Sequence, residues 1–384
     1  MVTNMPENIT RILDIRKEVE KKSCFLFGPR LTGKTWLLRH TLKNIRTYNL
    51  LDHDTFLRLS RSASLIGEEC TARDSIVVID EVQKLPSLLD AVHMLIEERG
   101  IHFLLTGSSA RKLRRGGVNL LGGRARIRNL YPLSFSELQK SFNLERAVNH
   151  GLLPAIYSSQ EPDEDLKAYV GTYLQEEVAA EGLTRNIPAF SRFLEVAALC
   201  NGKMINFANI ANDAQVARST VQEYFQILKD TLLAHEVPAW RKSVRRKPIT
   251  TSKFYLFDSG VARILQHRGR INPGSPEFGE AFEHFIFHEL LTYADYCRAG
   301  EIRYWRSLSG FEVDFVLGDT AAIEVKAGKN VSPQDLKGLR ALREEGGLKH
   351  YLMVSGERTA RVIDGIRILP WKEFLQQLWD GRFS

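Results

Sequence analysis

One loop constrains this chain more than any other segment. The run Ser23–Phe27 is short and apolar, as a buried strand is, and it leads directly into the sequence GPRLTGKT at residues 28–35. A helix is expected to start near Trp36. Glycines in such a loop let backbone N–H groups wrap around a phosphate, and the following helix adds the positive end of its dipole. The segment therefore predicts an α/β fold in which a phosphate-binding loop joins a strand to a helix.

A second strand supplies acidic groups. The β-branched run at residues 75–79 suits a parallel strand covered on both faces, and it ends in Asp80 and Glu81. Asp80 would hold a magnesium shell, whereas Glu81 would orient or activate the attacking water. An exposed acidic pair after a core strand is the alternative, and the upstream loop argues against it. We therefore expect hydrolysis of ATP with magnesium.

The residues expected to bind this nucleotide lie in and beside the loop. The Lys34 ammonium would neutralise the β- and γ-phosphates, and the Thr35 hydroxyl would join Asp80 as a magnesium ligand. A third apolar run, residues 101–105, ends in polar residues, of which Ser108 would sense the γ-phosphate from a place between the two earlier strands. An ordinary polar strand end is the alternative. The expected nucleotide-binding set is Gly28, Pro29, Arg30, Leu31, Thr32, Gly33, Lys34, Thr35, Trp36 and Ser108.

These motifs, with IDEVQ, TGSSARKL, GGR and YPLSFSEL further along, resemble the AAA+ class of P-loop ATPases. They resemble more narrowly a prokaryotic family in which such an ATPase is fused to a C-terminal domain. The resemblance implies a homo-oligomer, a ring or hexamer, in which an arginine of a neighbouring subunit completes the ATP site. Its pattern points to Arg124. DNA contact is the rival role for the arginines of this stretch, which also include Arg111, Arg114, Arg115, Arg126 and Arg128.

The middle of the chain is predicted to be helical and to contain a winged helix. Helical spacing runs through residues 165–181 as a lid or bundle, and a short helix at residues 205–211 precedes a turn and a second helix near Ser219. That arrangement is typical of a helix-turn-helix, although it also serves as a spacer. Five cations in seven residues then suit a phosphate backbone, with a solvated charged loop as the alternative. The expected DNA contacts are Arg218, Ser219, Arg241, Lys242, Arg245, Arg246 and Lys247.

The C-terminal third carries a second acidic pattern. After a Gly- and Pro-containing boundary at residues 272–279, a helix bears Glu283, and two strands joined at Gly318 bear Asp314 and the sequence EVK at residues 324–326. Alternation places Glu324 and Lys326 on one face. This constellation resembles PD-(D/E)xK nucleases, with Asp314 and Glu324 as ligands of magnesium or manganese, Lys326 positioning or deprotonating water, and Glu283 completing the site. A binding module that has lost cleavage is the alternative.

Composition limits the cellular setting. The chain has 384 residues, of which 43% are hydrophobic, so we expect more than one core. Its formal charge of +7 favours polyanionic partners. No apolar run is long enough for a membrane helix, and four scattered cysteines indicate neither a zinc site nor a disulfide framework. We expect a cytoplasmic protein without a membrane partner.

The expected fold class is α/β for both the N-terminal and the C-terminal regions of the chain. It comprises a three-layer AAA+ ATPase core at residues 1–136, a helical lid and winged-helix region at 137–271, and a restriction-endonuclease-like α/β domain at 272–384. The expected function is ATP-dependent processing of duplex or branched DNA in recombination, repair or defence, by a motor coupled to a nuclease-like domain. The alternative is a regulatory or signalling ATPase whose C-terminal domain only binds nucleic acid or protein.

Overall fold

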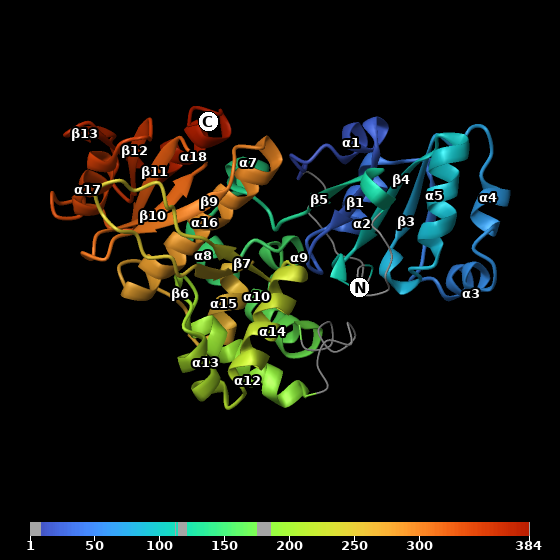
Figure 1. Ribbon diagram of the computed structural model, residues 1–384, viewed down its shortest axis with the longest axis horizontal. Helices are drawn as coiled ribbons and strands as arrows, with labels where there is room; N and C mark the ends of the chain where they lie inside the picture. The colour runs from blue at the N-terminus through green and yellow to red at the C-terminus, as the bar shows by residue number, and fades with distance from the viewer. Residues whose placement is uncertain (1–8, 112, 114–120, 175–185, 384) are drawn as a thin grey trace. The chain divides into compact units, whose positions relative to one another are not determined.

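The computed structural model describes residues 9–111, 113, 121–174 and 186–383 (Figure 1). Its compact units are two: residues 1–132 with 230–233, and residues 133–229 with 234–384. The second and third predicted regions thus lie in one unit. Within the described part, no helix is both long and apolar enough to cross a bilayer. Arg114, Arg115 and the end of the helical pattern predicted for residues 165–181 lie outside the described residues.

The first unit is built on a parallel five-stranded sheet in the order β2-β3-β4-β1-β5. The strand of the phosphate loop, β1, therefore lies between β4 and β5, and β4 separates it from the acidic strand β3. The strands are β1 (Ser23–Phe27), β2 (Arg46–Asn49), β3 (Ile76–Asp80), β4 (His102–Gly107) and β5 (Ala125–Asn129). The helices are α1 (Ile15–Lys21), α2 (Lys34–Thr41), α3 (His53–Arg61), α4 (Leu65–Glu69) and α5 (Leu88–Arg99), with 3₁₀ turns η1 (Val82–Lys84) and η2 (Leu121–Gly123).

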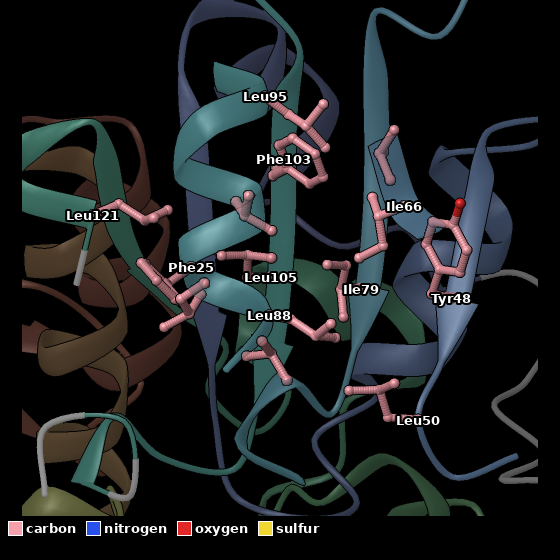
Figure 2. Close-up of a cluster of buried hydrophobic side chains, with 14 of the residues drawn as sticks. Phe25, Tyr48, Leu50, Ile66, Ile79, Leu88, Leu95, Phe103, Leu105 and Leu121 are labelled. Carbon is pink, nitrogen blue, oxygen red and sulfur yellow. The ribbon is translucent and has the colours of Figure 1, made fainter. Parts of the chain in front are cut away.

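An apolar layer packs one face of this sheet against α4 and α5. Figure 2 shows side chains from β1, β2, β3 and β4 packed with those of α5. Phe25, Ile79 and Phe103 are fully buried, as are Leu88 at the start of α5 and Ile66 in α4. Because the central strands are covered, their sequences are continuous apolar runs, and the first polar residues after β3 and β4 fall at the carboxyl edge of the sheet. That edge carries the candidate ATP site.

The second unit begins with helices and continues into a small sheet. Its first elements are α7 (Phe135–Leu138), η3 (Gln139–Ser141), α8 (Leu144–His150), α9 (Pro154–Tyr157), α10 (Pro162–Ala168) and the π-type turn η4 (Tyr169–Leu174). There follow α12 (Ile187–Leu199), β6 (Lys203–Met204), α13 (Phe207–Ala214), α14 (Arg218–Asp230), β7 (Ala234–Val237), β8 (Lys253–Leu256) and α15 (Ser259–Leu265). The three strands pair antiparallel in the order β6-β8-β7.

A six-stranded mixed sheet completes the second unit, in the order β13-β14-β12-β11-β10-β9. Strands β9, β10 and β11 form an antiparallel meander, and β12 and β14 pair parallel to β11 and β12 respectively. The elements are α16 (Pro276–Cys297), β9 (Ile302–Arg306), β10 (Glu312–Leu317), β11 (Ala321–Lys326), α17 (Lys337–Glu345), β12 (His350–Ser355), β13 (Arg361–Ile363), β14 (Ile366–Pro370) and α18 (Trp371–Trp379).

Helix α16 brings a helical carboxylate to this sheet. Ser275 caps its first turn by accepting the Phe278 N–H, Pro276 occupies its first position, and its 22 residues extend for about 33 Å. Midway, the buried Glu289 accepts hydrogen bonds from the Phe135 N–H at 2.7 Å and the Trp379 indole at 2.9 Å. These contacts fix the register of the helix, and therefore the height at which Glu283 faces the strands.

Candidate functional site

The phosphate loop has the geometry that its sequence predicts. Gly33 has φ 93° and caps α2, which begins at Lys34, and Leu31 also has a positive φ of 64°. A Cβ at Gly28 would lie 2.5 Å from the carbonyl oxygen of Leu130, so only glycine fits there. The Lys34 ammonium is buried and bonds the carbonyl oxygens of Gly28 at 2.6 Å and Pro29 at 3.1 Å. The lysine thus closes the loop on itself.

Arg11, upstream of the loop, is a residue that sequence reasoning missed. Its guanidinium is buried and donates to the carbonyl oxygen of Thr32 and to that of Tyr131, both at 2.7 Å. Thr32 in turn donates its hydroxyl to the Pro29 carbonyl at 2.8 Å. An isolated arginine before the first strand carries no sequence signal for such a contact. It braces the outer turn of the loop against the chain that follows β5.

The acids of β3 meet the end of β4. The Thr106 hydroxyl donates to Asp80, and the Glu81 N–H donates to the Thr106 oxygen at 3.2 Å. The Thr35 hydroxyl reaches the second Asp80 oxygen at 3.4 Å. Asp80 is buried, and Glu81 has the left-handed backbone φ 62°, ψ 43°, which is unusual for a residue with a Cβ. Such strain is often kept where a side chain must be aimed.

Gln83, which the sequence did not single out, connects Glu81 to β4. Its side-chain nitrogen donates to Glu81 at 2.5 Å and to the Ser108 hydroxyl at 3.4 Å. Gln83 is buried, and its side-chain amide oxygen, Oε1, has no hydrogen-bond partner within the described part of the chain. A Cβ at Gly107 would lie 2.4 Å from that oxygen. The predicted residues Asp80, Glu81 and Ser108 therefore belong to one polar chain, with Thr106 and Gln83 as its connecting members.

Arg124 lies at the opposite edge of the sheet from the phosphate loop. Ser23 pairs with Ala125, so Arg124 stands level with the start of β1, whereas the loop follows its end. At about 3.3 Å per residue, these ends are on the order of 17 Å apart. The Arg124 side chain is 39% exposed and ion-pairs with Glu97. It cannot reach the ATP site of its own subunit.

The neighbouring arginines have acidic partners within the first unit. Arg128 donates to Glu18 at 2.9 Å, and Arg126 lies 3.8 Å from the same carboxylate. Arg111 pairs with Asp230. These three arginines therefore have acidic partners in partly buried pairs. Among the described pairs of this stretch, that of Arg124 with Glu97 is the most exposed to solvent.

The C-terminal strands bring carboxyl groups together as predicted, but with a different lysine. Phe315 pairs with Ile323, and continuing that register sets Asp314 opposite Glu324. A register shift between Val313 and Val316 distorts β10 at Asp314, whose carboxylate accepts the Val325 N–H at 2.9 Å. Bulges of this kind commonly re-aim side chains beside functional sites.

The cation beside these acids is Lys253, the first residue of β8. Its ammonium lies 2.7 Å from Glu312, 3.8 Å from Asp314 and 3.9 Å from Glu283. The Tyr255 hydroxyl donates to Glu283 at 2.5 Å. The predicted lysine instead pairs with an acid beyond the strand: the Lys326 ammonium is 2.9 Å from Asp335, with a side chain that is 51% exposed. The role expected for Lys326 does not match this geometry.

Glu283, Glu312, Asp314 and Glu324 form a carboxylate cluster, and burial dominates the electrostatics of Glu283, Asp314 and Glu324. Burial and the nearby Asp314 raise the pKa of Glu283 to about 8, and burial also raises the pKa of Asp314 and of Glu324. Burial alone would lower the pKa of the Lys253 amine, but the surrounding carboxylates outweigh it and raise that pKa. The cluster therefore holds its cation firmly and resists holding every carboxyl group in the charged form.

The donor chemistry of the cluster fits a hard divalent ion, although the spacing does not. One Glu324 oxygen is buried and has no hydrogen-bond partner among the residues described, and carboxylate oxygens are the ligands that magnesium and manganese prefer. Even so, no three His, Cys, Asp or Glu side chains of the described ranges are arranged to hold a metal ion. The Lys253 ammonium lies where the Asp314 and Glu283 carboxylates face each other.

The predicted DNA contacts have different surroundings. Arg218 and Ser219 are exposed at the start of α14, whereas the basic segment 241–247 contacts the end of α17 and the turn between β10 and β11. Lys242 is 2.8 Å from Asp319, and Arg246 pairs with Glu344 and Glu345. The backbone N–H groups of Val244 and Arg245 also donate to Glu345, at 2.8 and 2.6 Å. Among the described acids, none pairs with Arg218, Arg241, Arg245 or Lys247, whose side chains face solvent.

The sheet order and phosphate loop of the first unit define a P-loop ATPase. Residues 20–139 match the family model described as AAA domain, so this unit is an AAA+ P-loop ATPase domain. Two family models described as domains of unknown function match the remainder, DUF8612 at residues 141–270 and DUF4143 at residues 278–374.

Relatives with similar sequences extend over most of the chain. An uncharacterized protein of Mycobacterium tuberculosis is 24% identical over 364 residues, which cover 91% of this chain and 80% of that protein. An uncharacterized protein of Haemophilus influenzae is 22% identical over 257 residues, 62% of each chain.

Two solved structures are similar at low scores. The replication initiator DnaA bound to AMPPCP and single-stranded DNA has a TM-score of 0.26 and 13% identity, covering 56% of this chain and 86% of that one. The Bacillus subtilis DNA clamp loader delta protein has a TM-score of 0.25 and 13% identity, covering 57% and 88%.

Proposed function

We propose that this protein is an ATP-driven machine that acts on duplex or branched DNA. The observation that supports ATP hydrolysis is the chain of hydrogen-bonded polar side chains that runs beside the phosphate loop from Thr35 through Asp80 and Glu81 to Ser108. Residues 28–35 would wrap the phosphates, and Lys34 would exchange its loop carbonyls for phosphate oxygens. Glu81, aimed by Gln83, would take a proton from the attacking water. Thr35 and Asp80 would hold magnesium, which screens the phosphate charge.

The helices and strands from α12 to β8 support DNA as the partner. In our proposal these elements act as a winged helix: α14 follows α13 after a tight turn at Gln215, and β7 and β8 flank the basic segment. The exposed side chains of Arg218, at the start of α14, and of Arg241, Arg245 and Lys247 form no ion pair with an acid of the described residues. Such cations suit phosphates without reading sequence.

Replacing Arg241, Arg245 and Lys247 together by alanine is expected to weaken duplex DNA binding by about tenfold or more and to lower the salt slope of log K by up to about 2.7, because three phosphate contacts are lost. Fluorescence anisotropy at several salt concentrations measures both. Lys242→Ala is the matched control, since Asp319 already pairs with this lysine. ATP turnover with linear, forked and four-way DNA completes the test. Turnover that no DNA stimulates, or an unchanged salt slope, contradicts the proposal.

The exposed edge that carries Arg124 favours a working unit of several subunits. In our proposal, Arg124 leaves Glu97 and enters the ATP site of a neighbour, as the separation of roughly 17 Å from its own loop requires. Arg124→Ala should then lower ATP turnover by roughly a hundredfold or more. Arg126→Ala, with a similarly exposed side chain, should leave turnover nearly unchanged.

Mixing distinguishes a contribution to a neighbour from one within the subunit. In an equimolar mixture of Arg124→Ala and Glu81→Gln subunits, each variant keeps the residue that the other lacks. Random pairing then gives about a quarter of the interfaces an intact Glu81 in the ATP site and an intact Arg124 in the neighbour. Turnover should therefore recover to a clearly measurable fraction of the parent value. A mixture no more active than its separate components would rule out the arginine in trans.

A nuclease activity of the C-terminal domain is the second candidate, and a specific observation favours it. Asp314 and Glu324 lie opposite each other on paired strands, Glu283 reaches them from α16, and one Glu324 oxygen is buried without a partner among the described residues. Because no three protein ligands of the described residues are arranged around one point, Asp314 and Glu324 would hold magnesium or manganese as two ligands, with water and the DNA phosphate as the others. Without cleavage, the same domain would serve a regulatory ATPase as a binding module.

A further inference from the structure

A cavity of about 720 Å³ lies in the second unit, at the carboxyl ends of three parallel strands. Its lining includes Gly328 and Lys329 after β11, Gly356 after β12, and Trp371 and Lys372 after β14. Its described lining does not include the acids of the carboxylate cluster. The carboxyl ends of parallel strands are a common place for ligands, and pockets for small molecules have volumes on the order of 300–1,000 Å³.

The loops at these strand ends are held together through the backbone. The Gly356 N–H donates to the Gly328 carbonyl oxygen at 3.0 Å, which ties the loop after β12 to the loop after β11. Helix α18 begins at the third strand end, and no side chain of the described residues caps its N-terminus. Its first N–H groups therefore lack the usual side-chain acceptor, and the positive end of the helix dipole lies at the cavity.

Aromatic rings form one wall of the cavity. Phe142 and Trp371 line it, with ring centroids 5.7 Å apart, and both are partly exposed. The Phe135 ring lies 5.1 Å from Phe142 and 6.0 Å from Trp371. The Phe285 ring lies 5.3 Å from Phe142 and 6.3 Å from Trp371. Packing among these four rings keeps the two lining rings in fixed positions, which favours stacking of a planar ligand.

Two lysines add positive charge to the same cavity. The Lys329 and Lys372 side chains are exposed, and neither forms an ion pair with an acid of the described residues. The Lys372 ammonium lies 5.3 Å from the centroid of the Trp371 ring. Glu145, an acid of the lining, has a partner of its own in Arg270, at 3.6 Å. The cavity therefore combines a stacking surface with available cations, which is the chemistry that recognises a planar group carrying a phosphate.

We infer that this cavity binds one nucleotide, with the base stacked on Trp371 and the phosphate held by Lys329 and Lys372. Stacking accepts any base, and lysines contact phosphate without reading sequence. The inference rests on the proposed function for the source of this nucleotide, which is an unpaired strand of the DNA that the protein processes. The C-terminal domain would then distinguish DNA with a single-stranded tail from a blunt duplex. A free nucleoside monophosphate has the same chemistry, so both sources are tested.

A duplex with an unpaired 5′ or 3′ tail, compared with the same duplex made blunt, tests the inference by fluorescence anisotropy. The parent protein should bind one of the tailed forms about tenfold more tightly than the blunt form. Replacing Lys329 and Lys372 together by alanine should remove this advantage. The matched control replaces Lys337 and Lys349, which are exposed lysines of the same domain outside the cavity. It loses the same charge, should keep the advantage, and should bind blunt duplex as the first variant does.

Trp371→Leu tests stacking separately from charge. Leucine keeps an apolar side chain against Phe135 and Phe285, so the domain should fold, which thermal melting verifies. A 2-aminopurine base at the free end of the tail should lose fluorescence on binding the parent, because stacking quenches it, and should keep its fluorescence with Trp371→Leu. Equal quenching by both proteins overturns the inference. If Trp371→Leu does not fold, the variants of the two exposed lysines decide.

Thymidine monophosphate tests the free nucleotide, in a Lys34→Ala background that removes the ATP site. Isothermal titration should detect binding that is lost when Lys329 and Lys372 are replaced. If neither this binding nor the advantage of tailed DNA depends on the two lysines, the inference is overturned, and normal binding of blunt duplex would leave the proposed function standing. If the parent binds no DNA but its binding of thymidine monophosphate depends on the lysines, the proposed function fails and the inference stands for a free nucleotide.

Discussion

Glu81→Gln is expected to lower ATP turnover by about a hundred- to a thousandfold while leaving ATP bound, because the amide keeps the shape of the side chain but cannot accept a proton from water. The Gln83 amide can still donate to the side-chain oxygen of the new glutamine, so the hydrogen bonds that continue to Ser108 should persist. Phosphate release measures turnover, and a fluorescent ATP analogue measures binding.

The control for this variant is Glu98→Gln, an exposed carboxylate near the end of α5, which should hydrolyse ATP like the parent. Lys34→Ala should behave differently from Glu81→Gln by losing ATP binding itself. Turnover of Glu81→Gln within threefold of the parent would exclude Glu81 as the base and direct attention to another acid.

Asp314→Asn and Glu324→Gln are each expected to reduce metal-dependent DNA cleavage by roughly a thousandfold, since each removes a charged ligand from the proposed ion. Asparagine can still accept the Val325 N–H, so the bulged strand should fold normally. Labelled linear, forked and four-way DNA incubated with Mg²⁺ or Mn²⁺ reports cutting, and thermal melting verifies folding.

Asp319→Asn is the matched control, because this carboxylate lies in the turn of the same hairpin, exposed and paired with Lys242. Its cleavage rate should equal that of the parent. If Asp314→Asn cuts as well as Asp319→Asn, or if the parent cuts no DNA with either ion, the C-terminal domain is a binding module and the regulatory function becomes the better interpretation.

Local sequence patterns predicted the elements that carry chemistry. The strand, loop and helix around Gly28–Thr35, the acidic end of β3 and the hairpin at Gly318 are present, because each depends on neighbours in sequence. The AAA+ domain is confirmed by its family match. The expected place of β4, and of Ser108 at its end, between β3 and β1 is confirmed by the strand order β2-β3-β4-β1-β5, whereas no local pattern predicted the places of β2 and β5.

Contacts between distant segments account for what the sequence did not reveal. Alternation along β11 correctly places Glu324 and Lys326 two residues apart on a strand, but it cannot show that Asp335 lies beyond the strand end and attracts the lysine. Lys253 and Thr106 likewise have ordinary local sequences, and only tertiary packing brings them to Asp314 and Asp80. Helix α17 begins only at Lys337, because Ser332 and Asp335 form a hydrogen-bonded turn before it.

The basic segment between β7 and β8 also has a mechanical meaning. It is anchored through Arg246 and two backbone N–H groups to Glu344 and Glu345, and six residues after Lys247 the same chain becomes Lys253. A polyanion bound to this segment would compete with those two glutamates for its cations. The same short stretch of chain carries the Lys253 ammonium inside the carboxylate cluster. A surface segment that pairs with Glu344 and Glu345 is thus joined to the buried charge of Lys253 by only a few residues of chain.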